Sequence, residues 1–302
     1  MQHSRVEKTG IDRREHERRL IAWLRDRGSV LIGFSGGVDS AYLACVAVEA
    51  LGRENVVAVI GKSASYPESQ WASARAVARQ FSVPVVEIDT EELSDPRYAA
   101  NPTNRCYFCK SELWSRLAPL ATQRGLACVV DGTNADDRVD YRPGARAAAE
   151  WGVLSPLAAL GFTKSDIREL SKARGIPTWR QPSAPCLSSR IPYGTAVTPD
   201  RLRRIEAAEA ALRALGVDGD LRVRFHGELA RVELAPNEIG RWLEAKLAER
   251  LRRAVLDAGF ARVAIDLRGF RSGSLNVLGG VVRDVADASA PNEETAPEAP
   301  AA

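Results

Sequence analysis

Residues 29–40 read Ser-Val-Leu-Ile-Gly-Phe-Ser-Gly-Gly-Val-Asp-Ser, an apolar segment that leads directly into paired glycines. The apolar part, 29–34, predicts a short buried strand, and the small residues of 41–50 predict a helix. Gly36 and Gly37 let the backbone approach an anion, and the first N–H groups of the new helix point at the same place. The stretch therefore predicts a phosphate-binding loop between a strand and a helix.

The residues around the two glycines refine this prediction. Ser35 and Ser40 add hydroxyl donors on either side of Val38. Asp39 is unexpected in a pure anion site, which indicates that it holds a magnesium ion or orients the loop. The alternative is a generic glycine-rich turn, and the strand–loop–helix context argues against it.

A second candidate phosphate motif fails on spacing. Gly61-Lys62-Ser63 resembles the end of a Walker A loop, but that motif needs a glycine five residues earlier, where Val56 stands. Lys62 and Ser63 follow a predicted strand, so we expect them at the same sheet edge, available to the nucleotide. A solvated lysine at a strand end is an equally good reading.

The first half of the chain alternates strands with helices. Strands are predicted at 55–60, 85–88 and 127–130, and helices at 69–81 and 110–124. This succession predicts a parallel sheet covered on both faces, with ligands at the carboxyl ends of its strands. Gly132 and Asn134 follow the strand 127–130 and are therefore expected to contact the nucleotide.

The pattern changes after a Pro- and Ser-rich segment, 177–199. A helix is predicted at 199–215, strands at 221–225 and 230–234, a helix at 237–258 and a strand at 263–267. We expect a small α+β domain here, with limits of 1–185 for the first domain and 186–283 for the second. Residues 284–302 carry no basic residue and little to bury, so a disordered tail is predicted.

Composition sets broad limits. The chain has 302 residues, 45% of them hydrophobic, and a net charge of +3, which does not demand a nucleic-acid or membrane partner. No apolar run is long enough to span a membrane. The five cysteines are an odd number spread over a long chain, which favours thiols in a reducing cytoplasm over a disulfide framework.

Ser-Gly-Gly-Val-Asp-Ser resembles the signature of the PP-loop ATP pyrophosphatases, which adenylate a substrate oxygen and release pyrophosphate. Residues 185–194, Pro-Cys-Leu-Ser-Ser-Arg-Ile-Pro-Tyr-Gly, and 266–276, Asp-Leu-Arg-Gly-Phe-Arg-Ser-Gly-Ser-Leu-Asn, look like the LarE family. Residues 131–137 and 161–164 extend this resemblance from about residue 12 to about residue 280. It implies a PP-loop domain, adenine nucleotide alpha hydrolase-like and Rossmann-like, followed by a smaller α+β domain.

The resemblance also implies an activity. LarE proteins use ATP and Mg²⁺ to activate a carboxylate of pyridinium-3,5-biscarboxylic acid mononucleotide and convert it to a thiocarboxylate, a step in nickel-pincer cofactor synthesis. The sulfur-carrying cysteine of the family maps onto Cys186. A thiolate suits attack on an acyl-adenylate, and Arg190 would lower the pKa of the Cys186 thiol if both faced the cleft. The alternative is a small cysteine packed in a Pro-rich loop.

Cys106 and Cys109 form a Cys-x-x-Cys pair that allows several readings: a redox dithiol, half of a zinc site or part of an iron–sulfur site. A structural zinc is hard to assemble because there is no second such pair and the chain has three histidines. Some LarE relatives carry three active-site cysteines, which implies a 4Fe–4S cluster on Cys106, Cys109 and Cys186. We favour this form over sacrifice of Cys186 to dehydroalanine, and over bystander cysteines at a helix start.

Arg222 and Arg224 alternate along a predicted strand and therefore project from the same face. Two guanidinium groups suit the phosphate of a mononucleotide, although a solvated sheet face is the usual reading of such a pair. Glu206 and Asp266 are weaker substrate-binding candidates in the same domain.

The sequence as a whole therefore predicts a cytoplasmic, homo-oligomeric sulfur transferase acting on a small molecule, without nucleic-acid or membrane partners. Within the same superfamily, the rivals are a tRNA thiolase and an amide-forming synthetase. The rival from another class is a nucleotide-binding or metal-carrier protein without turnover.

Overall fold

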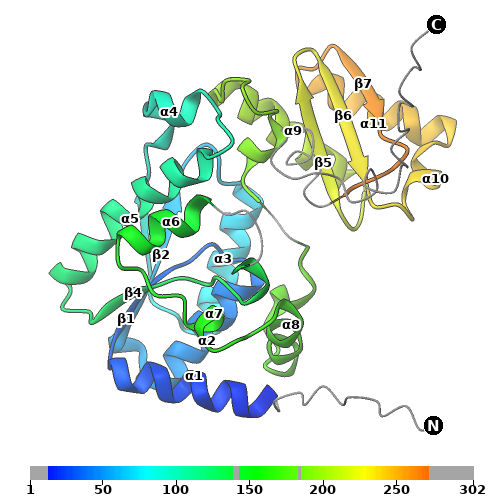
Figure 1. Cartoon of the computed structure of the whole chain (residues 1–302). Helices are drawn as coiled ribbons and strands as arrows, with labels where there is room; N and C mark the ends of the chain where they lie inside the picture. The colour runs from blue at the N-terminus through cyan, green and yellow to red at the C-terminus, as the bar shows by residue number, and fades with distance from the viewer. Residues whose placement is uncertain (1–12, 139–142, 183–184, 272–302) are drawn as a thin grey trace, which may run out of the picture.

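A computed structural model describes residues 13–138, 143–182 and 185–271 of the chain. These residues build two sheets, one of four parallel strands and one of three mixed strands (Figure 1). The predicted tail, 284–302, and the end of the second domain and of its last motif, from residue 272 on, lie outside the described residues.

The four-stranded sheet contains β1 (Val30–Gly33), β2 (Val56–Lys62), β3 (Val85–Asp89) and β4 (Cys128–Val130). Its order is β3-β2-β1-β4, and Val30 of β1 is in register with Val56 on one side and Cys128 on the other. The chain adds β2 and β3 on one side of β1 and then β4 on the other side. The connections therefore diverge at the carboxyl end of β1, which is where a parallel sheet binds ligands.

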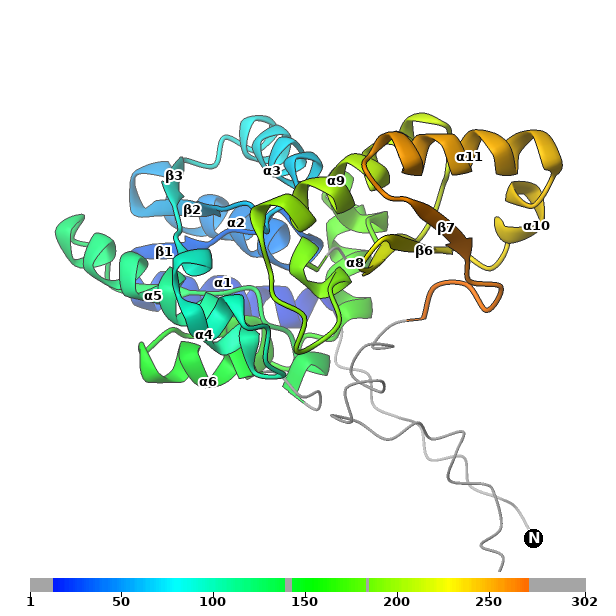
Figure 2. The same cartoon turned by 90° about the horizontal axis from the view of Figure 1, so that it is seen from above.

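Helices cover both faces of this sheet, as predicted (Figure 2). One face, which includes Ile32 and Ala58, packs on α1 (Arg13–Arg27), α2 (Val38–Leu51), α3 (Glu68–Gln80) and α8 (Lys164–Ala173). The other face, which includes Leu31 and Val57, packs on α5 (Arg105–Gln123) and α6 (Pro143–Glu150). Successive strand residues thus enter different cores, which is why the strands are apolar throughout.

Helix α5 begins earlier than the predicted residue 110. The amide of Tyr107 donates to the carbonyl of Asn104 at 2.9 Å, so the helix is already formed there. Cys106 and Cys109 consequently lie in its first two turns. The short helices α4 (Pro96–Ala99) and α7 (Pro156–Ala159) and several 3₁₀ turns were not predicted, because single turns carry little periodic signal.

The second sheet follows α9 (Pro199–Ala214) and contains β5 (Leu221–His226), β6 (Leu229–Leu234) and β7 (Arg262–Ile265). Strand β6 pairs antiparallel with β5 and parallel with β7, which confirms the predicted β–β–α–β succession. The helix predicted over 237–258 is wrong as a single element. It is α10 (Ile239–Trp242) and α11 (Ala245–Asp257), separated by Glu244 in an extended conformation, because the buried Trp242 ring turns into the core.

The two halves of the chain share apolar packing. The core of the second sheet takes in Leu187 and Ile191, and also Tyr98 of α4. Across the described ranges, no helix combines the length and apolarity needed to cross a bilayer.

Candidate functional site

The predicted phosphate loop, residues 35–40, joins β1 to α2 and requires glycine at its centre. Gly36 has φ +71°, and a Cβ there would lie 2.5 Å from the Cβ of Ala74 on α3. Gly132, after β4, is equally constrained, because a Cβ would come within 2.8 Å of the backbone nitrogen of Ser40. The ends of β1 and β4 therefore meet at this loop, as the strand order requires.

Hydroxyl groups and backbone bonds hold the loop open at the start of α2. Ser35 Oγ lies 3.2 Å from Ser40 Oγ and accepts from the Gly37 amide at 3.4 Å. Tyr66 and Gln70 both donate to the carbonyl of Ser35, at 2.9 and 2.8 Å. No side chain caps α2 at Gly37 in the described part of the chain, so the first amides of this 14-residue helix are available to an anion.

Asp39 and Lys164 form an ion pair beside the loop. Lys164 Nζ donates to Asp39 Oδ2 at 2.5 Å, while Asp39 Oδ1 is buried without a hydrogen-bond partner among the described residues. A buried carboxylate oxygen with unused capacity fits a hard cation such as Mg²⁺. Lys164 was missed as a site residue. The sequence does hold a clue to this role, because Lys164 directly follows Thr163, the N-cap of α8. The positive end of a helix disfavours a lysine unless an anion lies nearby.

Asn134 shapes the turn after β4. Its buried side-chain oxygen accepts from the amides of Asp136 and Asp137 at 3.0 and 3.2 Å. Asp131, at the start of the same turn, accepts from Ser155 Oγ at 2.7 Å. These bonds fix the backbone that carries Gly132 to the phosphate loop; direct contact of Asn134 with a nucleotide stays a prediction.

Lys62 and Ser63, at the end of β2, are engaged by neighbouring side chains. Lys62 Nζ lies 3.8 Å from Glu87 Oε2 and 4.6 Å from the centre of the Trp71 ring. Ser63 Oγ donates to the buried Glu92 at 2.5 Å. Both residues lie at the predicted sheet edge, and their contact with the nucleotide stays a prediction.

Two hydrogen bonds connect the segment that carries Cys186 to the same sheet edge. The amide of Leu187, the next residue, donates to the carbonyl of Ser65 at 2.8 Å. The neighbour of Ser65 is Tyr66, whose hydroxyl donates to Ser35 of the phosphate loop. The segment that carries the thiol is thus tied to the loop that follows β2, on the phosphate side of the sheet.

The three candidate sulfur ligands influence one another electrostatically. The protein atoms around its thiol raise the pKa of Cys106, Arg105 opposes this, and Cys186 adds to it, although the residue as a whole stays open to solvent. Burial also raises the pKa of Cys109, and the nearby charges of Glu92 and Cys186 raise it further. Within the described ranges, no group of three His, Cys, Asp or Glu residues is arranged to hold a single metal ion.

The other two cysteines belong to the packing of the first domain. Cys45 is buried in α2, and burial raises the pKa of its thiol to about 12. Cys128 packs partly buried against the same core. Neither thiol is near its ionised form at neutral pH, which suits a structural role.

Arg190 is bound to the backbone that carries Cys186. Its buried guanidinium pairs with Glu209 through two bonds of 2.9 Å. It also donates to the carbonyls of Pro185 and Cys186 at 2.6 and 3.2 Å. This geometry holds the Cys186 main chain in place.

Arg222 and Arg224 lie with Arg190 in a group that we call the arginine cluster. Arg224 donates to Glu233 and to the carbonyl of Ser189, each at 2.9 Å. Arg222 lies over the Phe270 ring, 4.8 Å from its centre. Burial, and then the nearby charge of Arg190, lower the pKa of Arg222 to about 10, so it remains cationic at neutral pH. Both strand residues are 5% exposed, in contrast to a solvated sheet face.

The two weaker substrate candidates have structural partners. Glu206 of α9 accepts from the backbone amide of Glu68 at 2.7 Å and so caps the start of α3. Asp266 lies 3.5 Å from Arg231 and 3.6 Å from Arg268. Substrate contacts by either carboxylate stay predictions.

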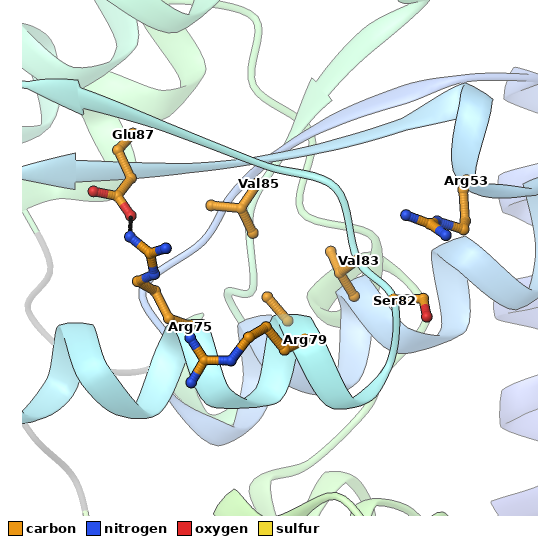
Figure 3. A pocket seen from close by; sticks show the side chains of 8 residues that line it. Arg53, Arg75, Arg79, Ser82, Val83, Val85 and Glu87 are labelled. Atoms are coloured by element: carbon orange, nitrogen blue, oxygen red, sulfur yellow. Dashed lines mark hydrogen bonds and ion pairs between the residues drawn. The ribbon is translucent and has the colours of Figure 1, made fainter.

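A cavity of about 300 Å³ lies beside β3, away from these groups (Figure 3). Its lining includes Arg53, Arg75 and Arg79 around the apolar Val83 and Val85. Glu87 pairs with Arg75 at 2.9 Å. None of its lining residues is a predicted site residue.

Comparisons with known proteins agree with this geometry. The NAD synthase family model matches residues 22–117, which include the phosphate loop. An uncharacterised protein of Synechocystis is 44% identical over 246 residues, covering 82% of this chain and 91% of that protein. Pyridinium-3,5-bisthiocarboxylic acid mononucleotide synthase of Lactiplantibacillus plantarum is 38% identical over 257 residues, covering 85% and 92%. An NH(3)-dependent NAD(+) synthetase of Finegoldia magna is 28% identical over 171 residues, covering 52% and 68%.

Proposed function

We propose that this chain is an ATP-dependent sulfur transferase. It belongs to the LarE family, the pyridinium-3,5-bisthiocarboxylic acid mononucleotide synthases. Its substrate is pyridinium-3,5-biscarboxylic acid mononucleotide, of which it converts a carboxylate to a thiocarboxylate. The observation that carries the proposal is the pair of hydrogen bonds that tie the Cys186 segment to the loop after β2, and that loop to Ser35. We further expect a cytoplasmic homo-oligomer.

The first step is adenylation at the phosphate loop. A carboxylate oxygen of the substrate attacks the α-phosphorus of ATP, the bond to the β-phosphate bridge breaks, and pyrophosphate leaves. The free amides at the start of α2 and the Lys164 ammonium stabilise the phosphate charges. Asp39 would hold the Mg²⁺ that neutralises the polyphosphate. Lys62, Ser63 and Asn134 are proposed to contact the rest of the nucleotide.

The second step brings sulfur to the activated carboxylate through Cys186. In the route without a cluster, its thiolate attacks the acyl carbon, and AMP leaves with the former carboxylate oxygen. Arg190 keeps the Cys186 backbone in position during this attack.

Cys106 and Cys109 complete the proposed sulfur site. With Cys186 they offer three thiolates, a donor set whose chemistry would suit a 4Fe–4S cluster, and the charges of the three thiols act on one another. When bound, the cluster would supply sulfide from an iron that lacks a cysteine ligand. Without it, Cys186 gives up its own sulfur and becomes dehydroalanine.

The arginine cluster is proposed to bind the substrate phosphate. Arg222 and Arg224 are both buried, and Arg224 donates to the carbonyl of Ser189, three residues after Cys186. A phosphate that enters this cluster gains charge-assisted bonds in a largely desolvated place. Asp266 and Glu206 are proposed to contact the remainder of the mononucleotide.

Pyrophosphate release tests the proposal when it is measured with ATP and either the pyridinium mononucleotide or tRNA. We expect release with the mononucleotide alone, together with a thiocarboxylate product. Release with tRNA instead, or no release with either substrate, would contradict the proposed function.

Iron analysis and mass spectrometry of anaerobically purified protein separate the two sulfur routes. Bound iron and sulfide, with Cys186 intact after turnover, support the cluster. Iron-free protein that transfers one sulfur and loses the mass of H₂S at Cys186 rejects it.

A further inference from the structure

The turn that carries Cys186 is held by a set of buried polar side chains from the segment before α5. Asn101 is fully buried, and its side-chain amide donates to the carbonyls of Ile191, Pro192 and Thr195 at 3.2, 2.8 and 2.9 Å. The backbone carbonyl of Asn101 accepts from the Gly194 amide at 2.9 Å. The two N–H groups of one side-chain amide are thus shared among three carbonyls of a segment some ninety positions away, and loss of this amide would leave buried carbonyls without a donor.

Arg105 extends this contact to the residues next to Cys186. Its guanidinium is 3% exposed and donates to Asn101 Oδ1 at 2.5 Å and to the carbonyl of Ser188 at 3.0 Å. The Ser188 hydroxyl lies 2.7 Å from the hydroxyl of Tyr98, which is also buried. Ser188 is the second residue of the 3₁₀ turn that begins directly after Cys186, and it is hydrogen-bonded to both Arg105 and Tyr98.

The charge of Arg105 also acts on the Cys186 turn. In the described part of the chain no carboxylate pairs with it, although buried cations usually require an anion. The groups that interact with its charge are Cys186, Cys106 and the two tyrosines Tyr98 and Tyr193. The charge of Arg105 therefore acts on both thiols, that of the Cys186 turn and that of Cys106 on its own helix.

We propose that Asn101 and Arg105 are positioning residues for the sulfur-transfer step, which rests on the proposed function. They fasten the Cys186 turn to the start of α5, so that Cys186 and Cys106 face a common space. We call these two residues the clasp. The phosphate loop keeps contacts that do not pass through the clasp, because Gln70 of α3 donates to Ser35 and Ala74 of α3 packs against Gly36, although Tyr66 also links the loop to the Cys186 segment. Loss of the clasp therefore uncouples sulfur transfer from adenylation.

The test compares full-length Asn101→Gly, Arg105→Met and Arg105→Lys proteins with wild type. Glycine tolerates the φ of +57° at position 101, so that variant removes the side chain without backbone strain. Arg97→Met is the matched control, since Arg97 is exposed and pairs with Asp95 two positions away. Tyr98→Phe removes the one hydroxyl contact to Ser188 and serves if a stronger variant fails to fold.

The primary readout is thiocarboxylate formed per pyrophosphate released. We expect this ratio to fall by about a hundredfold in Asn101→Gly and Arg105→Met, because small misplacement of a reacting group has effects of that size. Arg105→Lys restores part of the ratio, and Arg97→Met leaves it unchanged. An unchanged ratio in both strong variants, or an equal loss of both half-reactions, would overturn the proposal.

Amide exchange across 186–197, measured by mass spectrometry without substrate, keeps the clasp testable apart from the activity. Faster exchange there in Asn101→Gly and Arg105→Met, with unchanged exchange in the phosphate loop, supports the clasp. Unchanged exchange in 186–197 contradicts it. Absence of pyrophosphate release in wild type would reject the proposed function, and the exchange result would still decide the clasp.

Discussion

The phosphate loop and the Cys186 turn lie at the same edge of the molecule but are built in different ways. The loop is six consecutive residues whose shape comes mainly from its glycines and helix amides, with Tyr66 and Gln70 bonded to the Ser35 carbonyl. The Cys186 turn is held by side chains from distant positions, among them Asn101, Arg105 and Glu209. A site made from backbone can be recognised in a short motif, whereas a site made from buried side chains exists only in the folded chain.

Charge differs between the two regions as well. At the loop, the uncapped amides of α2 contribute positive potential, with the ion pair of Lys164 and Asp39 beside them. In the arginine cluster, full charges are buried against Glu209 and Glu233. Removal of one partner from such a network leaves an uncompensated charge, so substitutions there affect stability and binding together.

The largest effect is expected at the sulfur end. Cys186→Ser should lower thiocarboxylate formation on the order of 10³-fold or more, since the sulfur donor of one route and a thiolate ligand of the other is lost. Pyrophosphate release that depends on the mononucleotide should persist, because the phosphate loop is intact. Cys128→Ser is the control, as Cys128 packs against the core. Product formation at the wild-type rate would mean that the two regions do not divide the reaction in this way.

The next effect tests whether the loop depends on its backbone. Gly36→Ala should destabilise the protein by about 1–3 kcal/mol because of the positive φ and the contact with Ala74. Pyrophosphate release should fall by about a hundredfold as the loop shifts. Gly28→Ala shares a positive φ but has open space around it, so it should cost stability without loss of release. Thermal melts and a pyrophosphate assay measure both quantities.

A smaller effect is expected in the arginine cluster. Arg222→Met should raise KM for the mononucleotide by about 10- to 100-fold, the size of one charge-assisted hydrogen bond, with KM for ATP unchanged. Arg203→Met, on the exposed side of α9, is the control. Steady-state kinetics decide the point, and equal changes in both KM values would argue against a dedicated phosphate site.

The smallest effect concerns the helix that carries Lys164. Thr163→Ala removes a capping box at the start of α8 and should cost about 1 kcal/mol of stability. Pyrophosphate release should fall slightly, because Lys164 is the next residue. Thr122→Ala, near the end of α5, is the control in denaturant melts. If both variants had the same stability, the capping box would contribute nothing measurable.

Much of the first domain was predictable because its signals are local. Apolar strand segments, glycine turns and the 29–40 motif each depend on neighbours in sequence, and the strand positions agree within a few residues. Lys164 was harder to find, because its partner Asp39 is 125 positions away. The break between α10 and α11 and the early start of α5 were also missed, since burial of Trp242 and a backbone bond to Asn104 decide them.

By itself, the sequence determined the parallel sheet, the phosphate loop at the end of its first strand and the family resemblance, because these depend on periodicity and on residues adjacent in the chain. Tertiary structure alone decided that Asn101 and Arg105 hold the Cys186 turn and that Lys164 faces Asp39. Those contacts join segments far apart in sequence. They form only when burial makes unsatisfied carbonyls and charges too costly to leave alone.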